Sequence, residues 1–357
     1  MKTYIKFLIE IFLKSFLYIS CSMLSLIFII NLLTELDFFK DINITTEFIV
    51  YLSLINSPSM LFEMFPFIFL ISTQLFFIRL FKNNEFQIFK YSGLKNTKIL
   101  SILTVSSFFL GLIIISLFYN FSSKLKNIYL EIKSNHSTDG KYLAVITKNG
   151  LWIKDKIDET NLIINANQIE DYFLIDAIIT EFDEKFNVVR SIKSKKININ
   201  NKNWIIHNPT IIQNNFISSK DLLNFTTNFD YNRIQTLFSN LSSLSLLKLF
   251  ELKRNYDLLN FSTTEIDIQI QRIISYPVYL VIMTLLSAIL MLKTKNFRGY
   301  MSKIGIGFLL TVVIYYINNF FNVLGTTQKI SYLSSVWMPI IILILFNIFM
   351  SLRINEK

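Results

Sequence analysis

The stretch Ile99–Phe121 reads ILSILTVSSFFLGLIIISLFYNF and contains no charged side chain. A helix that crosses the hydrocarbon core of a bilayer, about 30 Å thick, needs about 20 mostly apolar residues. The backbone of such a stretch must be helical, because the bilayer core offers no water to unpaired N–H and C=O groups. Directly afterwards, over Ser122–Thr264, polar residues become frequent. This boundary predicts a chain that lies partly in a membrane and partly outside it.

Five other stretches have the length and apolar character of a membrane span, two before Ile99–Phe121 and three after the polar region. The six predicted spans are approximately Ile11–Leu36, Ser59–Leu80, Ile99–Phe121, Ile270–Leu292, Ser302–Leu324 and Ser334–Leu352. The first is longer than the apolar core of a signal peptide, about 7–15 residues, and no small-residue cleavage site follows it, so we expect it to be retained. The pattern predicts an α-helical polytopic membrane protein of six spans arranged as three plus three.

The placement of Lys and Arg predicts the orientation of the chain. They gather in the N-terminal segment, in the loops after spans two and four, and at the C-terminus. If the chain crosses the membrane six times, all four of these segments lie on the same side of the membrane. That side is expected to be cytoplasmic by the positive-inside rule. The residues are Lys2, Lys6, Lys14, Arg79, Lys82, Lys90, Lys95, Lys98, Lys293, Lys295, Arg298, Lys303, Arg353 and Lys357. The other short loops carry only Lys40 and Lys329. We therefore expect an inner-membrane protein with both termini cytoplasmic and residues 122–264 on the outer side of the membrane.

The composition supports a membrane protein and limits its chemistry. Apolar residues make up 52% of the 357 residues and charged residues 17%, whereas a soluble domain carries about 25% charged residues. The mean hydropathy is +0.46. A single cysteine, Cys21, excludes a disulfide within the chain, and two distant histidines, His136 and His207, give no metal-binding pattern. We expect no metal or cofactor, and the topology accounts for the basic loops without nucleic acid.

The polar region contains short β-prone runs broken by Asn, Asp and Gly. The runs are Tyr142–Thr147, Leu151–Lys154, Asn161–Asn165, Asp171–Phe182, Asn187–Asn200 and Trp204–Gln213. Several short strands at such spacing are typical of an all-β sandwich or jellyroll. Leu241–Tyr256 has helical spacing instead. We predict three parts: residues 1–121, a periplasmic β-jellyroll-like domain over 122–264 with a helical connector at about 241–256, and residues 265–357.

The loop Asn83–Lys98, NNEFQIFKYSGLKNTK, is a candidate docking segment on the cytoplasmic side. Asn84–Ser92 has helical character, and Gly93 is placed to end that helix. A short helix in a basic loop could dock into a groove of a partner or lie on the anionic lipid surface. The candidate docking residues are Glu85, Phe86, Phe89, Ser92 and Gly93.

Polar residues at the outer ends of the spans are candidates for a lipid path. Glu35, Asp37 and Lys40 lie at the outer end of the first span, and could line an entry for an amphiphile or mark where the helix leaves the lipid. In the fifth span the candidates are Asn318, Asn319, Phe320 and Phe321. Adjacent amides are costly against acyl chains unless they pair with another helix or line a cavity. We interpret Glu63 as an interfacial carboxylate.

No G-x-x-x-x-G-K-[ST], G-x-S-x-G or H-E-x-x-H motif occurs, so the chain has neither a phosphate-binding loop nor a catalytic constellation. We expect no catalytic residues and a transport subunit whose ATP hydrolysis occurs in a partner. The alternative is a non-transporting scaffold or sensor whose β domain binds a partner. An enzyme of lipid metabolism is a third reading.

Several short motifs occur in an order that resembles one family along essentially the whole chain. They are Phe65-Pro66-Phe67, Asn84-Glu85-Phe86, Tyr91-Ser92-Gly93-Leu94, Gly150-Leu151-Trp152-Ile153-Lys154-Asp155, Thr226-Thr227-Asn228-Phe229 and Trp337-Met338-Pro339. The chain resembles the YjgP/YjgQ permeases, LptF and LptG, of the lipopolysaccharide export ABC transporter. The segment Gly150–Asp155 and the Trp-Met-Pro of the last span favour the LptG branch.

The resemblance implies an export permease that extracts lipopolysaccharide from the inner membrane and passes it to a periplasmic bridge. It implies an LptF-like second permease, an LptB-like ATPase dimer docked on Asn84–Gly93 with Glu85 at the acidic coupling position, and LptC-like and LptA-like jellyroll proteins. Relatives carry basic residues near the outer end of span one, where this chain has Asn31 and Leu32, with Lys40 beyond.

Overall fold

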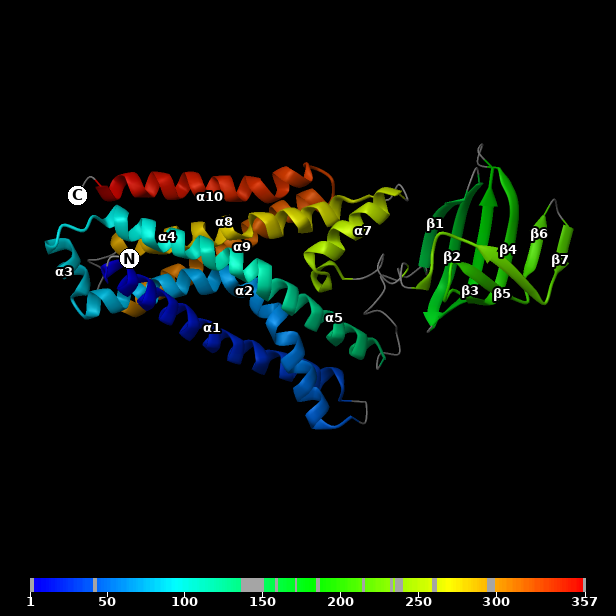
Figure 1. Ribbon diagram of the computed structural model, residues 1–357, viewed down its shortest axis with the longest axis horizontal. Helices are drawn as coiled ribbons and strands as arrows, with labels where there is room; N and C mark the ends of the chain where they lie inside the picture. The colour runs from blue at the N-terminus through cyan, green and yellow to red at the C-terminus, as the bar shows by residue number, and fades with distance from the viewer. Residues whose placement is uncertain are drawn as a thin grey trace. The chain divides into compact units, whose positions relative to one another are not determined.

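The computed structural model describes residues 3–40, 44–135, 151–157, 160–170, 172–183, 187–213, 216–231, 234, 240–258, 262–293 and 299–355. The chain divides into two compact units, one formed by residues 1–126 and 264–357 and the other by residues 127–263. Figure 1 shows the first as a helical bundle and the second as largely a β-sheet. The strand expected over Tyr142–Thr147 lies outside the described residues.

Within the described residues, six helices are long and apolar enough to span a membrane, as the sequence predicted. The first two are α1 (Thr3–Phe38) and α2 (Thr46–Lys82), and a short helix, α3 (Glu85–Tyr91), follows them. The last three are α8 (Thr264–Lys293), α9 (Tyr300–Thr326) and α10 (Tyr332–Asn355). The six-span fold class with an inserted antiparallel sheet is confirmed.

The third span is one continuous helical path whose hydrogen-bond pattern changes midway. It consists of α4 (Asn96–Ile113), the π-helical segment η1 (Ile114–Tyr119) and α5 (Asn120–Asn135). Gly111 lies against α8 here, since a Cβ on this residue would be 3.0 Å from the Cα of Pro277. The path continues beyond Phe121, so residue 122, where we expected the inserted domain to begin, lies inside a helix.

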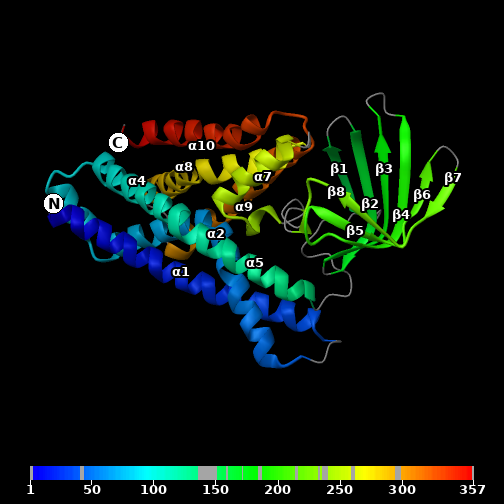
Figure 2. The ribbon, with the colours of Figure 1, turned by 45° about the vertical axis from the view of Figure 1, so that its right-hand side comes forward.

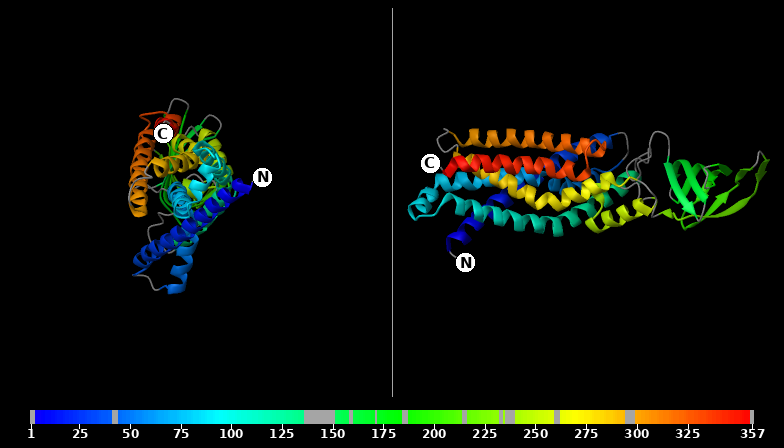
Figure 3. Two further views of the ribbon diagram at one scale, coloured as in Figure 1. Left: turned by 90° about the vertical axis from the view of Figure 1, so that its left-hand side faces the viewer. Right: turned by 90° about the horizontal axis from the view of Figure 1, so that it is seen from above.

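The centre of the bundle is formed by α2 and α8. In the most apolar stretch of each, 61% of the residues are buried, compared with 17% in α1 and 11% in α9. Aromatic side chains fill much of the space between α1 and α2, as where the rings of Phe12 and Phe16 pack on Phe69. Seen from above, α9 (orange) runs along one edge of the bundle (Figure 3). Among the six spans, α1 and α9 therefore leave the largest surfaces uncovered.

Among its described residues, the second unit contains an eight-stranded sheet in which all pairs are antiparallel. The strands are β1 (Leu151–Ile157), β2 (Thr160–Glu170), β3 (Phe173–Phe182), β4 (Val188–Asn198), β5 (Asn203–His207), β6 (Thr210–Gln213), β7 (Phe216–Ser219) and β8 (Leu222–Thr226). The order runs β1-β2-β3-β4-β5-β8, while β6 pairs with β4 and β7 pairs with β6 (Figure 2).

One strand prediction was wrong. We expected Trp204–Gln213 to form a single strand, but Asn208 adopts a left-handed conformation (φ 46°) and Pro209 follows it. The chain bends there because Pro cannot donate a ladder hydrogen bond. As a result β5 pairs with the second half of β4, at residues 196–198, while β6 pairs with residues 191–193.

One face of the sheet forms the core of the second unit. Leu162, Ile164 and Ala166 alternate along β2 and are buried, as expected for side chains with a period of two. Trp204 is fully buried, and its indole N–H donates to the Phe229 carbonyl oxygen at 2.9 Å. The helical segment expected near residues 241–256 consists of a short 3₁₀ turn, η2 (Leu241–Ser243), and α7 (Leu246–Leu258).

Candidate functional site

The short helix α3 lies at the end of the bundle that also carries both chain termini (Figure 1), which we call the α3 end. Asn84 directly before it has a φ of 58°, and Gly93 just after it has a φ of 78°. Asn and Gly are the residues that adopt this left-handed region at least cost. The chain therefore reverses at both ends of α3, which holds the helix as a separate element between α2 and α4.

The aromatic residues of α3 divide between two environments. Phe86 is only 3% exposed and packs on Phe81 and Phe77 of α2, with ring centroids 5.0 and 6.5 Å away. Phe89 is half-buried, 6.1 Å from the ring of Phe7 on α1. Phe86, which we expected on the docking face, thus anchors α3 to its own bundle.

The exposed face of α3 contains residues that the sequence argument did not single out. Ile88 is 60% exposed and Tyr91 is 87% exposed. Ser92 and Gly93, directly after the helix, are also exposed. Helical spacing alone could not reveal which of two apolar stripes packs inward, because a seven-residue helix with four apolar or aromatic residues has no single apolar face.

Glu85 opens α3 and is partly buried. Its Oε1 accepts a hydrogen bond from the Asn83 side-chain amide at 3.2 Å. Its Oε2 is buried and has no hydrogen-bond partner among the described residues. A carboxylate oxygen without a protein partner costs free energy unless water or another molecule donates to it. Glu85 thus has one carboxylate oxygen bonded within the loop and one enclosed oxygen without a partner among the described residues.

The lipid-path candidates at the other end of the bundle fall on separate helices. Glu35 of α1 is 1% exposed, whereas Lys40 is exposed and pairs with Asp37 at 3.4 Å. On α9, the Asn318 amide donates to the Tyr279 hydroxyl of α8 at 2.8 Å, so this amide pairs with another helix. Asn319, by contrast, is exposed.

The aromatic candidates beside the two amides differ in exposure. Phe320 is exposed and Phe321 is half-buried, with their rings 5.8 Å apart. The main packing partners of α1 are α2 and α4, and those of α9 are α2, α8 and α10. Within the described residues, Glu35 and Lys40 thus belong to a different part of the bundle from the α9 candidates, since α1 and α9 are not main packing partners of each other.

A buried polar cluster joins α1 to α2 at Asn31. The Asn31 amide donates to the Ser57 hydroxyl, and the Asn56 amide donates to Asn31 Oδ1, each at 3.3 Å. Interhelical hydrogen bonds of this kind stabilise membrane bundles by about 0.6 kcal/mol on average. Asn31 therefore faces a neighbouring helix. Glu63, which we interpreted as an interfacial carboxylate, is a separate residue that lies exposed on α2.

Among the described residues, no group of three or more His, Cys, Asp and Glu side chains is arranged to hold a metal ion. The features that stand out are a tethered helix at one end, uncovered faces on α1 and α9, and a sheet inserted between spans three and four. This arrangement suits a membrane subunit that works with other chains.

Comparison with known proteins agrees with this arrangement. No curated protein is similar enough to the chain to count as a match. The family model described as "Lipopolysaccharide export system permease LptF/LptG" matches residues 6–353. The match includes all six membrane spans and the inserted sheet, and it confirms the family resemblance seen in the sequence. The chain is therefore a multi-pass inner-membrane protein that belongs to the LptF/LptG family of lipopolysaccharide export system permeases.

Proposed function

We propose that the chain is the LptG-like half of a permease pair that extracts lipopolysaccharide from the inner membrane and passes it to a periplasmic bridge. The observation that carries this function is the family match over residues 6–353 together with six spans and an inserted sheet. The LptG branch rests on the segment Gly150–Asp155 and on Trp337-Met338-Pro339.

In this proposal the orientation follows the distribution of Lys and Arg, with the α3 end in the cytoplasm and the sheet in the periplasm. A test uses the full chain with Cys21→Ser as a background. Cysteines are introduced at the exposed positions Tyr91 and Asp221 and are labelled in intact cells with a thiol reagent that does not cross the inner membrane. Labelling of the cysteine at 221 alone is expected, and labelling of the cysteine at 91 alone would overturn the orientation.

An LptB-like ATPase dimer docks on α3 in the proposed complex. The exposed side chains of Ile88 and Tyr91 support α3 as the contact. The chain has no nucleotide-binding motif of its own. ATP binding shifts the subunits toward one conformation only if that conformation binds ATP more tightly, and α3 transmits this preference because Phe86 fixes it to α2.

An LptF-like permease covers the open faces of α1 and α9. Exposed apolar surface alone would suit lipid, but Asn319 is exposed as well, and an amide facing acyl chains is costly. That side of α9 therefore meets polar atoms of the second permease or of the transported lipid. Glu35, Lys40, Phe320 and Phe321 flank this path.

The edge of the sheet is the proposed contact for LptC-like and LptA-like jellyroll proteins. Strand β7 pairs only with β6 among the described residues, and Phe216 and Ile217 on it are 80% and 74% exposed. An exposed apolar edge strand is a template for adding a strand from another chain.

The function is tested by purifying the tagged full chain from cells whose own copy has been depleted. Copurification of an ATPase and a homologous permease, bound lipopolysaccharide in the mass spectrum, and restored lipopolysaccharide at the cell surface are expected. In Glu85→Arg, ATPase copurification and growth should fall, whereas Glu47→Arg, a charge reversal on an exposed residue at the other end of α2, should leave both unchanged. A chain that restores growth without an ATPase would instead support the scaffold or sensor alternative.

A further inference from the structure

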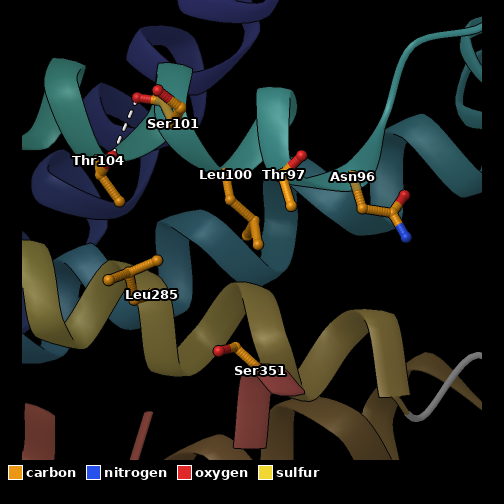
Figure 4. Close-up of a pocket in the computed structure, with 7 residues that line it drawn as sticks. All are labelled: Asn96, Thr97, Leu100, Ser101, Thr104, Leu285 and Ser351. Carbon is orange, nitrogen blue, oxygen red and sulfur yellow. Dashed lines mark hydrogen bonds between the residues drawn. The ribbon is translucent and has the colours of Figure 1, made fainter. Parts of the chain in front are cut away.

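A groove at the α3 end of the bundle lies outside the proposed lipopolysaccharide path. It has a volume of about 350 Å³ and lies between α4, α8 and α10 (Figure 4). The residues that line it are Asn96, Thr97, Leu100, Ser101, Thr104, Leu285 and Ser351. Its size is at the lower end of the range for small-molecule sites, about 300–1,000 Å³.

The groove changes from polar to less polar along its length. Asn96 and Ser351 lie close to the helix ends, while Thr104 lies eight residues further along α4, a distance of about 12 Å at 1.5 Å per residue. The Thr104 hydroxyl donates to the Ser101 carbonyl oxygen at 3.0 Å, so its polar atom is already bonded within its own helix. Around Leu100, Thr104 and Leu285 the groove therefore presents methyl and methylene groups, which suit an acyl chain.

One polar group at the mouth of the groove has no hydrogen-bond partner among the described residues. Asn96 Oδ1 is buried without a hydrogen-bond partner among the described residues. The assignment of O and N in an amide is interchangeable, so this group could accept from an ammonium or hydroxyl or, if turned, donate to a phosphate. An unpaired buried amide atom costs free energy, and a turn of the Asn96 side chain, which lines the groove, would let a ligand bond to it.

The charge around the mouth is positive. The Lys293 ammonium, at the end of α8, lies 3.6 Å from the Met350 sulfur of α10, which is a weak acceptor. Within the described residues no carboxylate forms a salt bridge with Lys293, and Lys95 and Lys98 lie exposed at the start of α4. Basic pockets between membrane helices on the cytoplasmic side are suited to anionic lipid headgroups.

We infer that this groove binds an anionic phospholipid of the leaflet at the α3 end. Its phosphate lies between Lys293 and Asn96, and one acyl chain follows Leu100, Thr104 and Leu285. The apolar part of the groove favours a lipid over a nucleotide, and the lysines favour a headgroup with net negative charge over a zwitterionic one. Because the groove joins span three to spans four and six, the bound lipid would hold the two halves of the bundle together at this end.

The test measures lipid binding to the purified full chain by native mass spectrometry, with dioleoylphosphatidylglycerol or dioleoylphosphatidylcholine added in detergent. The chain is expected to retain phosphatidylglycerol in preference. Lys293→Gln should weaken its retention about fivefold, the equivalent of about 1 kcal/mol per basic side chain. Lys329→Gln, at the other end of the bundle, is the matched charge control and should bind as the unaltered chain does.

A second pair of variants separates the groove from general surface attraction. Ser101→Phe places a ring in the groove and should block retention, while Ser116→Phe, exposed on the same helical path, should not. The inference would be overturned if the chain retained the two lipids equally, or if Lys293→Gln and Lys329→Gln had equal effects. It would also be overturned if Ser101→Phe retained the lipid fully, or if inorganic phosphate alone displaced it. None of these readouts depends on the ATPase or on lipopolysaccharide, so this test is independent of the test of the proposed transport function.

Discussion

The side chain of Gln74 occupies the space that a Cβ on Gly307 would need. Gln74 is fully buried, its amide donates to the Lys303 carbonyl oxygen at 2.9 Å, and a Cβ built on Gly307 would lie 2.2 Å from its Nε2. This contact joins α2 in the first half of the bundle to α9 in the second. The glycine lets the two helices approach closely, as small residues do in membrane bundles.

Gly307→Ala should therefore destabilise the bundle by about 1–3 kcal/mol, because Gln74 must move and lose its hydrogen bond. The free energy of unfolding is measured in mixed detergent micelles. Gly305→Ala is the matched control, since a Cβ at that position meets no atom within 4 Å. In a Gln74→Ala background the cost of Gly307→Ala should shrink, and an undiminished cost would show that the two residues are not coupled.

Gly111→Ala should cost a similar amount, about 1–3 kcal/mol. The atom that its Cβ would approach is the Cα of Pro277, which is backbone and cannot rotate away. The helical path next to Gly111 is π-helical over Ile114–Tyr119, so a shift of α4 should also be visible as faster amide hydrogen exchange in that segment. Stability and exchange equal to those of the unaltered chain would contradict the close approach.

Asp155→Ala should destabilise the β-sheet unit by about 2–3 kcal/mol, since hydrogen bonds to a charged group are among the stronger ones. Asp155 is 1% exposed and accepts from the Thr227 hydroxyl at 2.6 Å and from the main-chain and side-chain N–H groups of Asn228 at 3.0 and 2.9 Å. Limited proteolysis of the full chain in rising urea reports the loss. Asp221→Ala, an exposed carboxylate in the same unit, should not change the cleavage midpoint.

Tyr91→Ala should lower ATPase copurification about tenfold while leaving thermal stability unchanged. The side chain is 87% exposed, so its removal leaves no cavity, whereas a truncated aromatic at the centre of an interface often costs more than 1 kcal/mol of binding energy. Phe86→Ala, by contrast, should lower the thermal stability, because this ring is buried against α2. Equal stability losses in both variants would exclude Tyr91 as a free contact residue.

Phe216→Lys should reduce crosslinking of the sheet to a periplasmic jellyroll protein, because a charged side chain on an edge strand opposes the addition of another strand. The expected crosslink is scored with a photoreactive residue at the neighbouring position 217. Val188→Lys, an exposed apolar residue of β4, provides the control. A crosslink that survives Phe216→Lys unchanged would place the contact elsewhere.

The six spans and the inserted sheet could be predicted from the sequence because apolar length and the distribution of Lys and Arg are local properties. Ile99–Phe121 must be helical in lipid whatever its neighbours are, since each backbone group needs a partner. The motifs around Phe65 and Gly93 also indicated the family, because their order and spacing can be read directly along the chain.

What only the tertiary structure decided was the direction in which each side chain faces. Phe86 and Tyr91 belong to the same short helix, yet one is buried and the other is exposed, because α2 packs on one side of that helix only. Likewise, nothing in the local sequence links Gln74 to Gly307, or Asn96 to Leu285 and Ser351. Burial depends on helices that are distant in sequence, and the free energy of packing is set by the atoms that they bring together.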